Sequence, residues 1–112
     1  MLVVEDDALV GLYLEDLLDS WGCEVVGPVA SASEAEAAAA AGQFKFALLD
    51  VNLIGGTSFA AAEILSSKHV PFAFVTAYGL ASVRQDLGAA AILSKPIVVA
   101  ELKRVLGEAG VF

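Results

Sequence analysis

Four apolar residues, Phe46 to Leu49, run directly into the carboxylate of Asp50. A short continuous apolar run is typical of a strand that is buried on both faces in the centre of a parallel sheet. Because an unpaired charge is too costly to bury in such a core, we expect Asp50 where the strand ends. Open α/β sheets bind ligands at that edge, although an aspartate that merely ends a strand or caps a turn is an equal alternative.

The remainder of the chain alternates between short apolar runs and segments with helical spacing. This alternation predicts a parallel sheet with right-handed crossovers and helices on both faces. We therefore predict an α/β, flavodoxin-like, doubly wound five-stranded parallel sheet of order 2-1-3-4-5, with a short or irregular fourth helix. Pro28 favours an edge position for the second strand. The predicted strands are 1–4, 24–29, 46–49, 72–75 and 90–93, and the predicted helices are 8–21, 31–41, a third from 57 or 58, a weak one near 81–87, and 98–109.

Polar residues mark the starts of two of these helices. Asp7 occupies an N-cap or first-turn position, and Ser31 with Glu34 forms the S-x-x-E pattern of a capping box. Apolar residues at helical spacing predict the inner face of the first helix. That face consists of Leu9, Val10, Tyr13, Leu14, Leu17, Leu18 and Trp21.

The composition excludes several classes of protein. The 112-residue chain has a formal net charge of −8, and its six basic residues are scattered, which argues against nucleic-acid binding by this chain. No apolar run reaches the roughly 18 residues that span a membrane. The chain shows no charged-then-apolar leader, so we expect a cytoplasmic protein with no membrane partner. The single Cys23 excludes an internal disulfide and is expected to be a small buried hydrophobe.

Polar side chains follow four of the predicted strands. Parallel strands bring their carboxyl ends to one edge, and neighbouring strands lie about 4.8 Å apart, so these side chains should face one small crevice. Carboxylates that close repel by roughly 3 kcal/mol per pair at an effective dielectric near 20. A lysine and a Mg²⁺ ion would balance them, and together with a threonine hydroxyl they form a site for phosphoryl oxygens. The residues are Glu5, Asp6, Asp50, Thr76 and Lys95.

Four short motifs contain these residues, in the order Val4-Glu5-Asp6-Asp7, Leu49-Asp50-Val51-Asn52, Val75-Thr76-Ala77 and Ser94-Lys95-Pro96. Each motif alone is weak, but the ordered set resembles the receiver domain (CheY-like) of bacterial two-component response regulators. The resemblance covers the whole chain, so we interpret residues 1–112 as one receiver domain.

The resemblance implies roles for the residues at this edge. Asp50 would accept a phosphoryl group from the histidine of a sensor kinase or phosphotransfer protein. Lys95 would hold the phosphoryl group, and Thr76 would move toward it as a switch. The Lys95–Pro96 peptide bond would be cis.

The resemblance also implies Mg²⁺ as the cofactor. Asp6 and Asp50 would ligate it, Glu5 would lie alongside through water, and the backbone carbonyl of Asn52 would be a third protein ligand.

The segments 50–55 and 71–79 are similar to those of stand-alone alphaproteobacterial receivers with a Phe-x-Thr-x-Tyr-like segment. Two departures from the wider family stand out. Ile92 replaces the aromatic residue that most receivers carry on the fifth strand, so Tyr78 is a candidate for its part in the switch. Ile54, followed by Gly55-Gly56, replaces a proline of many receivers, which predicts a looser loop.

The resulting interpretation is a phosphorylation-dependent switch that changes a protein-interaction surface. Its partners would be a sensor histidine kinase or phosphotransfer protein and a downstream protein or effector domain, and a phosphorylation-dependent homodimer is one form of output. The chain would catalyse only its own aspartate phosphorylation and dephosphorylation. Two alternatives stay open: an unphosphorylated interaction module, and a phosphoaspartyl phosphohydrolase, against which Asn52 stands because it cannot readily donate a proton. His69 is expected to be a surface or capping residue.

Overall fold

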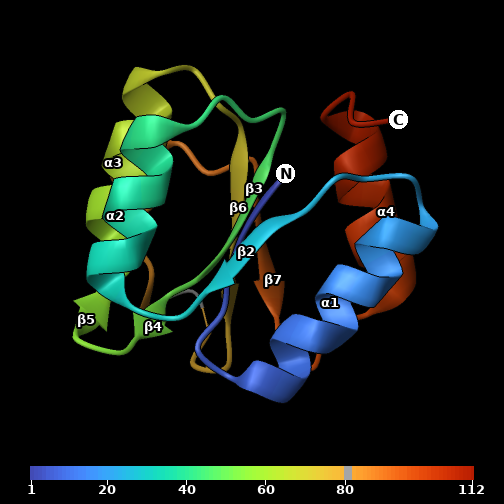
Figure 1. The fold of residues 1–112 in the computed structure, drawn as a ribbon, viewed down its shortest axis with the longest axis horizontal. Helices are drawn as coiled ribbons and strands as arrows, with labels where there is room; N and C mark the ends of the chain where they lie inside the picture. The colour runs from blue at the N-terminus through green and yellow to red at the C-terminus, as the bar shows by residue number, and fades with distance from the viewer. Residues whose placement is uncertain (80–81) are drawn as a thin grey trace.

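The computed structural model describes residues 1–79 and 82–112 of the chain. Within them lies a five-stranded sheet of order β2-β1-β3-β6-β7, in which neighbouring strands are parallel. Because β4 and β5 form a separate ribbon, this is the predicted order 2-1-3-4-5 (Figure 1). The strands of the sheet are β1 (Leu2–Val4), β2 (Val26–Val29), β3 (Ala47–Asp50), β6 (Phe72–Thr76) and β7 (Ala91–Ser94).

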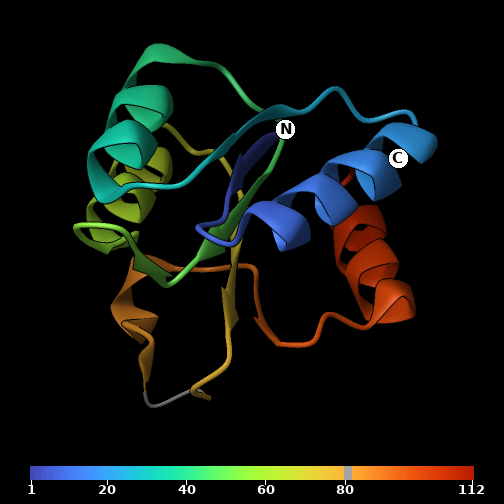
Figure 2. The same cartoon turned by 60° about the horizontal axis from the view of Figure 1, so that its bottom comes forward.

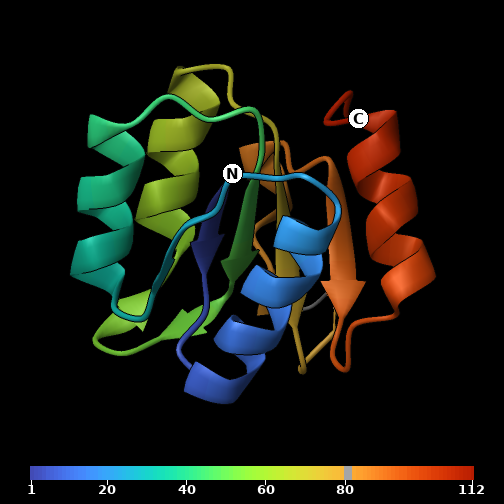
Figure 3. The same cartoon turned by 45° about the vertical axis from the view of Figure 1, so that its right-hand side comes forward.

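Helices cover both faces of the sheet, as the alternation of strands and helices predicted. Figure 3 shows the strands of the main sheet side by side, with helices on either side of it. The helices α1 (Ala8–Ser20) and α4 (Val99–Glu108) pack on one face, and α2 (Ala32–Ala41) and α3 (Phe59–Ser67) pack on the other.

Alternate residues of each central strand enter the two layers of the core. In β3, Ala47 and Leu49 pack with α2 and α3, whereas Leu48 packs with α1 and α4. Successive side chains of a strand point to opposite faces, so a strand covered on both sides must be apolar at every position. The run before Asp50 is therefore continuous, and Asp50 follows it at the edge of the sheet.

The strand β2 occupies an edge of the sheet, as Pro28 predicted, although it begins at Val26 rather than Glu24. A β-bulge gives β2 one more residue than β1 between two paired positions. Gly27 lies in this bulge with a φ of 101°, and a Cβ there would be 2.6 Å from the backbone oxygen of Val3. Glycine is therefore required at this position.

The helix α1 begins with the predicted cap but buries a narrower face than predicted. The Asp7 carboxylate accepts hydrogen bonds from the backbone N–H groups of Leu9 and Val10 at 2.9 and 3.3 Å. Leu9 is 78% exposed and Tyr13 is 51% exposed, so the prediction that both belong to the inner face is wrong. When the apolar stripe of a helix is wider than the surface on which it packs, the residues at the borders of the stripe remain exposed to solvent. The buried residues of α1 are Gly11, Leu14 and Leu18.

Side-chain hydrogen bonds stabilise both ends of α2. The predicted cap of α2 is present, because Ser31 Oγ accepts a hydrogen bond from the Glu34 N–H at 3.2 Å and donates one to the Glu34 carboxylate at 2.9 Å. Lys68, at the end of α3, donates to the carbonyl of Ala39 at 3.0 Å and to that of Gly42. A cation on unsatisfied carbonyls at a helix C-terminus is stabilising.

The segment between β3 and α3, predicted as a loose loop, contains a small antiparallel ribbon. Its strands are β4 (Asn52–Leu53) and β5 (Gly56–Thr57). Ile54 is bonded to the loop after β2, since its N–H donates to the Ala30 carbonyl and its carbonyl accepts from the Ala32 N–H. Backbone pairing therefore restrains this segment, and a loop looser than in receivers with a proline here stays a prediction.

The weak helix predicted near 81–87 falls partly outside the described residues, since Ala81 is not described. From residue 82 onward the structure has a short 3₁₀ turn, η2 (Gln85–Leu87), in which Leu87 is buried. The Arg84 guanidinium lies 2.7 Å from the carboxylates of Glu63 in α3 and of Asp86. Figure 2 shows the segment that contains η2 standing away from the sheet, on the side of α3.

Three minor predictions can be compared with the structure. His69 is exposed at the end of α3, with a φ of 58°, as expected of a surface residue. Cys23 is half-buried against the core rather than fully buried. Within the two described ranges, no helix combines the length and the apolar character that crossing a membrane requires.

Candidate functional site

Three carboxylates meet at the edge of the sheet where the strands end. Glu5 and Asp6 follow β1, and Asp50 is the last residue of β3, the neighbouring strand. One carboxylate oxygen from each lies within 4.8 Å of the others. Glu5 is 3% exposed and Asp50 is 6% exposed, whereas Asp6 is exposed. The topology thus brings together the three acids that sequence analysis singled out.

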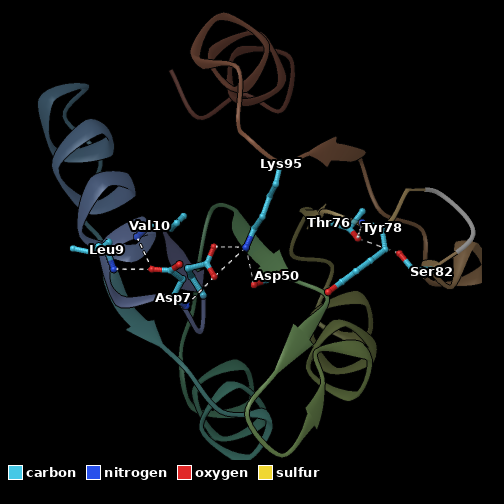
Figure 4. Close-up of polar contacts among 9 residues, drawn as sticks. Asp7, Leu9, Val10, Asp50, Thr76, Tyr78, Ser82 and Lys95 are labelled. Atoms are coloured by element: carbon cyan, nitrogen blue, oxygen red, sulfur yellow. Dashed lines mark hydrogen bonds and ion pairs between the residues drawn. The ribbon is translucent and has the colours of Figure 1, made fainter.

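Lys95, which follows β7, reaches across this edge to two of the acids. Its ammonium nitrogen lies 3.0 Å from Asp50 Oδ2 and 2.9 Å from Glu5 Oε1 (Figure 4). Glu5 also accepts a hydrogen bond from the Asp7 N–H at 3.1 Å. The Lys95–Pro96 peptide bond is cis, as the resemblance implied. One cation therefore compensates two buried acids, while Asp6 adds a third negative charge.

This excess of negative charge perturbs the acids. Burial raises the pKa of Asp50 to about 7, and the neighbouring Glu5 and Asp6 add to the effect although Lys95 opposes it. Burial also acts to raise the pKa of Asp6, but the neighbouring Asp50 and Glu5, the backbone and Lys95 lower it overall. Burial acts to lower the pKa of Lys95, but its hydrogen bonds to Glu5 and Asp50 raise it overall. Lys95 is therefore charged, and Asp50 is the acid whose charged form the cluster disfavours.

A cavity of about 150 Å³ adjoins the acids. Lys95 and the carboxylates of Asp6 and Asp50 form one part of its lining, and Ala77 and Tyr78 from the segment after β6 form another. Asn52 also lines it, in β4. The cavity is small and polar, which suits a few oxygen atoms rather than a large organic ligand.

The residues present fit a Mg²⁺ ion. Three carboxylates supply hard oxygen donors within the spacing that one ion can bridge, and Asn52 beside them has a carbonyl oxygen to offer. Three carboxylates face one lysine, so negative charge here exceeds what Lys95 balances. A divalent cation would remove that excess.

Thr76 is buried beside the cavity but does not line it. Its hydroxyl oxygen accepts a hydrogen bond from the Tyr78 N–H at 3.0 Å and lies 3.1 Å from the hydroxyl of Ser82 (Figure 4). The structure thus brings Glu5, Asp6, Asp50 and Lys95 together, and directs the Thr76 hydroxyl to the next loop.

Sequence analysis did not identify Ser82. It lies six residues beyond Thr76, in the stretch predicted as a weak helix near 81–87, and no pattern in the sequence marks it as part of the site. Ile92 of β7 packs into the core on the side of α2 and α3, and Tyr78 is 74% exposed at the mouth of the cavity.

A second cavity, of about 580 Å³, opens on the other side of Lys95. Its lining is mostly apolar and comes from α1 and from the segment before α4. The lining residues are Val10, Tyr13, Lys95, Pro96 and Ile97. Lys95 thus separates a polar pocket from an apolar groove.

Comparison with known proteins identifies the family. The sequence matches the model of the response regulator receiver domain over residues 1–106. It is 31% identical over 106 residues to the transcriptional regulatory protein PdtaR of Mycobacterium tuberculosis, an alignment that covers 91% of this chain and 52% of that protein. It is 30% identical over 115 residues to the phyllosphere-induced regulator PhyR of Methylorubrum extorquens, with 97% and 42% covered. The chain therefore spans about half the length of these curated relatives, or less.

Solved structures agree with the sequence comparison. The non-phosphorylated HemR receiver domain from Leptospira biflexa superposes with a TM-score of 0.83 and 32% identity, covering 96% of this chain and 90% of that one. The receiver domain of the sensor histidine kinase PA1611 from Pseudomonas aeruginosa, which has a magnesium ion coordinated in its active site cleft, superposes with a TM-score of 0.85 and 26% identity, covering 97% and 95%. The chain belongs to the receiver domain family of response regulators.

Proposed function

We propose that Asp50 accepts a phosphoryl group from a phosphohistidine of a sensor kinase or phosphotransfer protein. The observation that carries the proposal is the position of Asp50, which ends a buried strand, contacts Lys95 at 3.0 Å and faces a cavity of about 150 Å³. A carboxylate held against a lysine beside a small polar cavity is a nucleophile with room for a phosphoryl group.

In the proposed step, a carboxylate oxygen of Asp50 attacks the phosphorus atom. The new O–P bond forms as the P–N bond to the donor histidine breaks, and the imidazole leaves with the electron pair of that bond and takes up a proton. Lys95 holds a phosphoryl oxygen and stabilises the charge spread over the transferring group. Thr76 then donates a hydrogen bond to another phosphoryl oxygen, which draws the segment after β6 toward Asp50.

Mg²⁺ would be held by Asp6 and Asp50, with Glu5 alongside and the Asn52 carbonyl as a further ligand. When bound, the ion supplies positive charge that offsets the acids and the phosphoryl oxygens. Lys95 orients Asp50 through their contact, and the buried Glu5 keeps Lys95 charged and in place.

The phosphodonor protein is proposed to dock on the apolar groove beside Lys95. Leu9 and Val98 on the elements that form the groove are 78% and 58% exposed, and Tyr13, which lines it, is 51% exposed. Exposed apolar side chains next to a polar pocket favour a protein partner. An apolar helix that covers this groove would bring a histidine on its surface close to Asp50.

Docking and chemistry can be tested separately. Tyr13→Glu is expected to slow phosphorylation by a protein donor at least tenfold and to leave labelling by acetyl phosphate unchanged, because the small donor does not need the groove. Equal effects on both donors would contradict the assigned surface.

The proposed output is a change in a protein-interaction surface that a downstream protein or effector domain reads, with a homodimer of the phosphorylated form as one such output. The chain catalyses only its own phosphorylation and dephosphorylation. Asn52 lies at the cavity where a phosphohydrolase would need an acid, which disfavours turnover of phosphate esters. The proposed location of the chain is the cytoplasm, together with its phosphodonor protein.

The direct test is intact-protein mass spectrometry after incubation with acetyl phosphate and Mg²⁺. We expect a single phosphoryl adduct on the wild-type protein, no adduct without Mg²⁺ and none on the Asp50→Asn variant. An adduct that persists in that variant would refute Asp50 as the acceptor. Mg²⁺ binding without any adduct would favour an interaction module that works without phosphate.

A further inference from the structure

The hydroxyl of Thr76 contacts the hydroxyl of Ser82, a residue that has no part in the proposed phosphoryl transfer. Thr76 is 2% exposed, and its Oγ1 lies 3.1 Å from Ser82 Oγ, while the Tyr78 N–H donates to it at 3.0 Å. Figure 4 shows Thr76, Tyr78 and Ser82 grouped on one side of the site, apart from the contact of Lys95 with Asp50. The resting position of this hydroxyl is therefore fixed by the segment after β6.

The direction of the bond between the two hydroxyls follows from counting protons. A serine hydroxyl carries one proton, and Ser82 Oγ lies 2.7 Å from the Gly79 carbonyl oxygen, which can only accept. The Ser82 proton is thus committed to Gly79. In the contact between the two side chains, Thr76 must then be the donor and Ser82 the acceptor.

The single proton of Thr76 is consequently committed in the resting state. A phosphoryl group on Asp50 offers only acceptor oxygens, so Thr76 can serve it only by donating that same proton. Thr76 cannot donate to Ser82 and to the phosphoryl group at once. Donation by Thr76 to a phosphoryl group and its donation to Ser82 therefore exclude one another.

We propose that Ser82 is a positioning residue that holds Thr76 in the resting conformation and thereby sets how readily the phosphorylated conformation is reached. This inference rests on the proposed function, in which Thr76 donates to a phosphoryl oxygen on Asp50. Ser82 itself does not touch the phosphoryl group. Weakening the resting state raises the population of the competing state, which a ligand then binds with higher apparent affinity.

The central test is the apparent Kd of beryllofluoride, a mimic of the phosphoryl group, with Mg²⁺ present. We expect Ser82→Ala to tighten binding about fivefold, since the variant removes one ordinary hydrogen bond from the resting state. Ser82→Thr keeps the hydroxyl and should bind as the wild type does. Ser67→Ala is the matched control, because Ser67 Oγ donates to the Ile64 carbonyl at the same distance of 2.7 Å, with no threonine beside it.

A double-mutant cycle distinguishes this role from a general loosening of the loop. Thr76→Ala removes the proton that Ser82 accepts, so adding Ser82→Ala to it should change the Kd of beryllofluoride by less than about 1.5-fold, whereas independent sites would remain additive. A fivefold tightening that persists without the threonine hydroxyl would overturn the proposal, and so would an unchanged Kd in Ser82→Ala. Failure of the wild-type protein to bind beryllofluoride or to be labelled by acetyl phosphate would instead overturn the proposed function, and this inference with it.

A second readout needs neither metal nor phosphate. The Tyr78 amide donates to Thr76 Oγ1, so its hydrogen exchange reports whether Thr76 stays in place. We expect faster exchange of this amide in Ser82→Ala by a factor of about three or more, and wild-type exchange in Ser82→Thr and Ser67→Ala. Unchanged exchange in Ser82→Ala would show that Thr76 keeps its position without Ser82, and would contradict the proposal.

Discussion

Replacing Asp50 with asparagine tests the electrostatics of the site in the metal-free protein. The variant keeps the shape of the side chain and removes one negative charge from a cluster in which three carboxylates share one lysine. We expect Asp50→Asn to raise the free energy of unfolding at neutral and alkaline pH, although it abolishes phosphorylation. Its effects on stability and on function are thus opposite in sign.

The magnitude follows from the distances. At an effective dielectric near 20, each carboxylate within 4.8 Å repels Asp50 by about 3.5 kcal/mol, and Lys95 at 3.0 Å attracts it by about 5.5 kcal/mol. Solvent screening of the exposed Asp6 reduces the repulsion, and the desolvation of Asp50 adds to the cost. These charges alone leave a net penalty of about 1–2 kcal/mol, and because desolvation adds to it, the asparagine variant should gain that amount or more.

The pH dependence of stability should have the same sign. Because the pKa of Asp50 is raised from 3.8 to about 7, the folded protein binds the proton more tightly than the unfolded chain does. The stability of the wild-type protein should therefore fall, relative to the variant, as the pH rises from about 4 to about 7. The gain of the variant should be complete at about pH 8 and absent at about pH 4.

Urea denaturation with EDTA measures these differences, with Asp19→Asn as an exposed control that should stay within about 0.5 kcal/mol of the wild type. Mg²⁺ at ten times its Kd should stabilise the wild-type protein by about 1.4 kcal/mol, and the Asp50→Asn variant by clearly less. A variant less stable than the wild type at about pH 8 would refute the reasoning, since it would mean that Lys95 more than compensates the acids.

Three further predictions concern the scaffold, each measured as a free energy of unfolding in urea. Lys68→Met should cost about 1–2 kcal/mol, because it removes the ammonium group from the carbonyls that end α2. Gly27→Ala should cost about 2–3 kcal/mol, because its Cβ would meet a backbone oxygen at 2.6 Å. Gly22 has a similar φ of 81° but open space around it, so Gly22→Ala should cost only about 1 kcal/mol. Ser58→Ala should gain about 1 kcal/mol, since the buried Ser58 hydroxyl has no hydrogen-bond partner among the described residues, whereas Ser31→Ala should lose about 1 kcal/mol with its capping bonds. Equal effects of the two serine substitutions, or of the two glycine substitutions, would contradict these assignments.

The position of the site could be predicted from the sequence because two physical constraints coincide there. A strand covered on both faces must be apolar at every position, and an acid must lie where that strand ends. The register of β3 with β1 and β6 then decides which other strand ends come near Asp50. This is why an ordered set of polar residues after apolar runs was sufficient to predict that Glu5, Asp6, Asp50 and Lys95 converge.

Other features depend on packing that has no sequence period. The apolar stripe of α1 includes Leu9 and Tyr13, but only tertiary contact decides how much of a stripe is covered, and both residues are exposed. Gly11 is buried where a Cβ would lie 3.0 Å from a ring carbon of Pro28, a close approach that no side-chain pattern reveals. The contact of Ser82 with Thr76 likewise depends on the path of an aperiodic loop.

Lys95 and Ser82 each hold a group that a phosphoryl group would engage, but their removal should have opposite consequences. Lys95 compensates buried acids, so Lys95→Ala would leave Glu5 and Asp50 as uncompensated buried charges and should weaken both folding and phosphoryl binding. Ser82 accepts a hydrogen bond from Thr76 only in the resting arrangement, so its removal should weaken that arrangement alone and favour phosphoryl binding. Lys95 therefore sets how strongly the site holds a phosphoryl group, and Ser82 sets how readily Thr76 leaves its resting position. A variant of one residue should not reproduce the effect of the other.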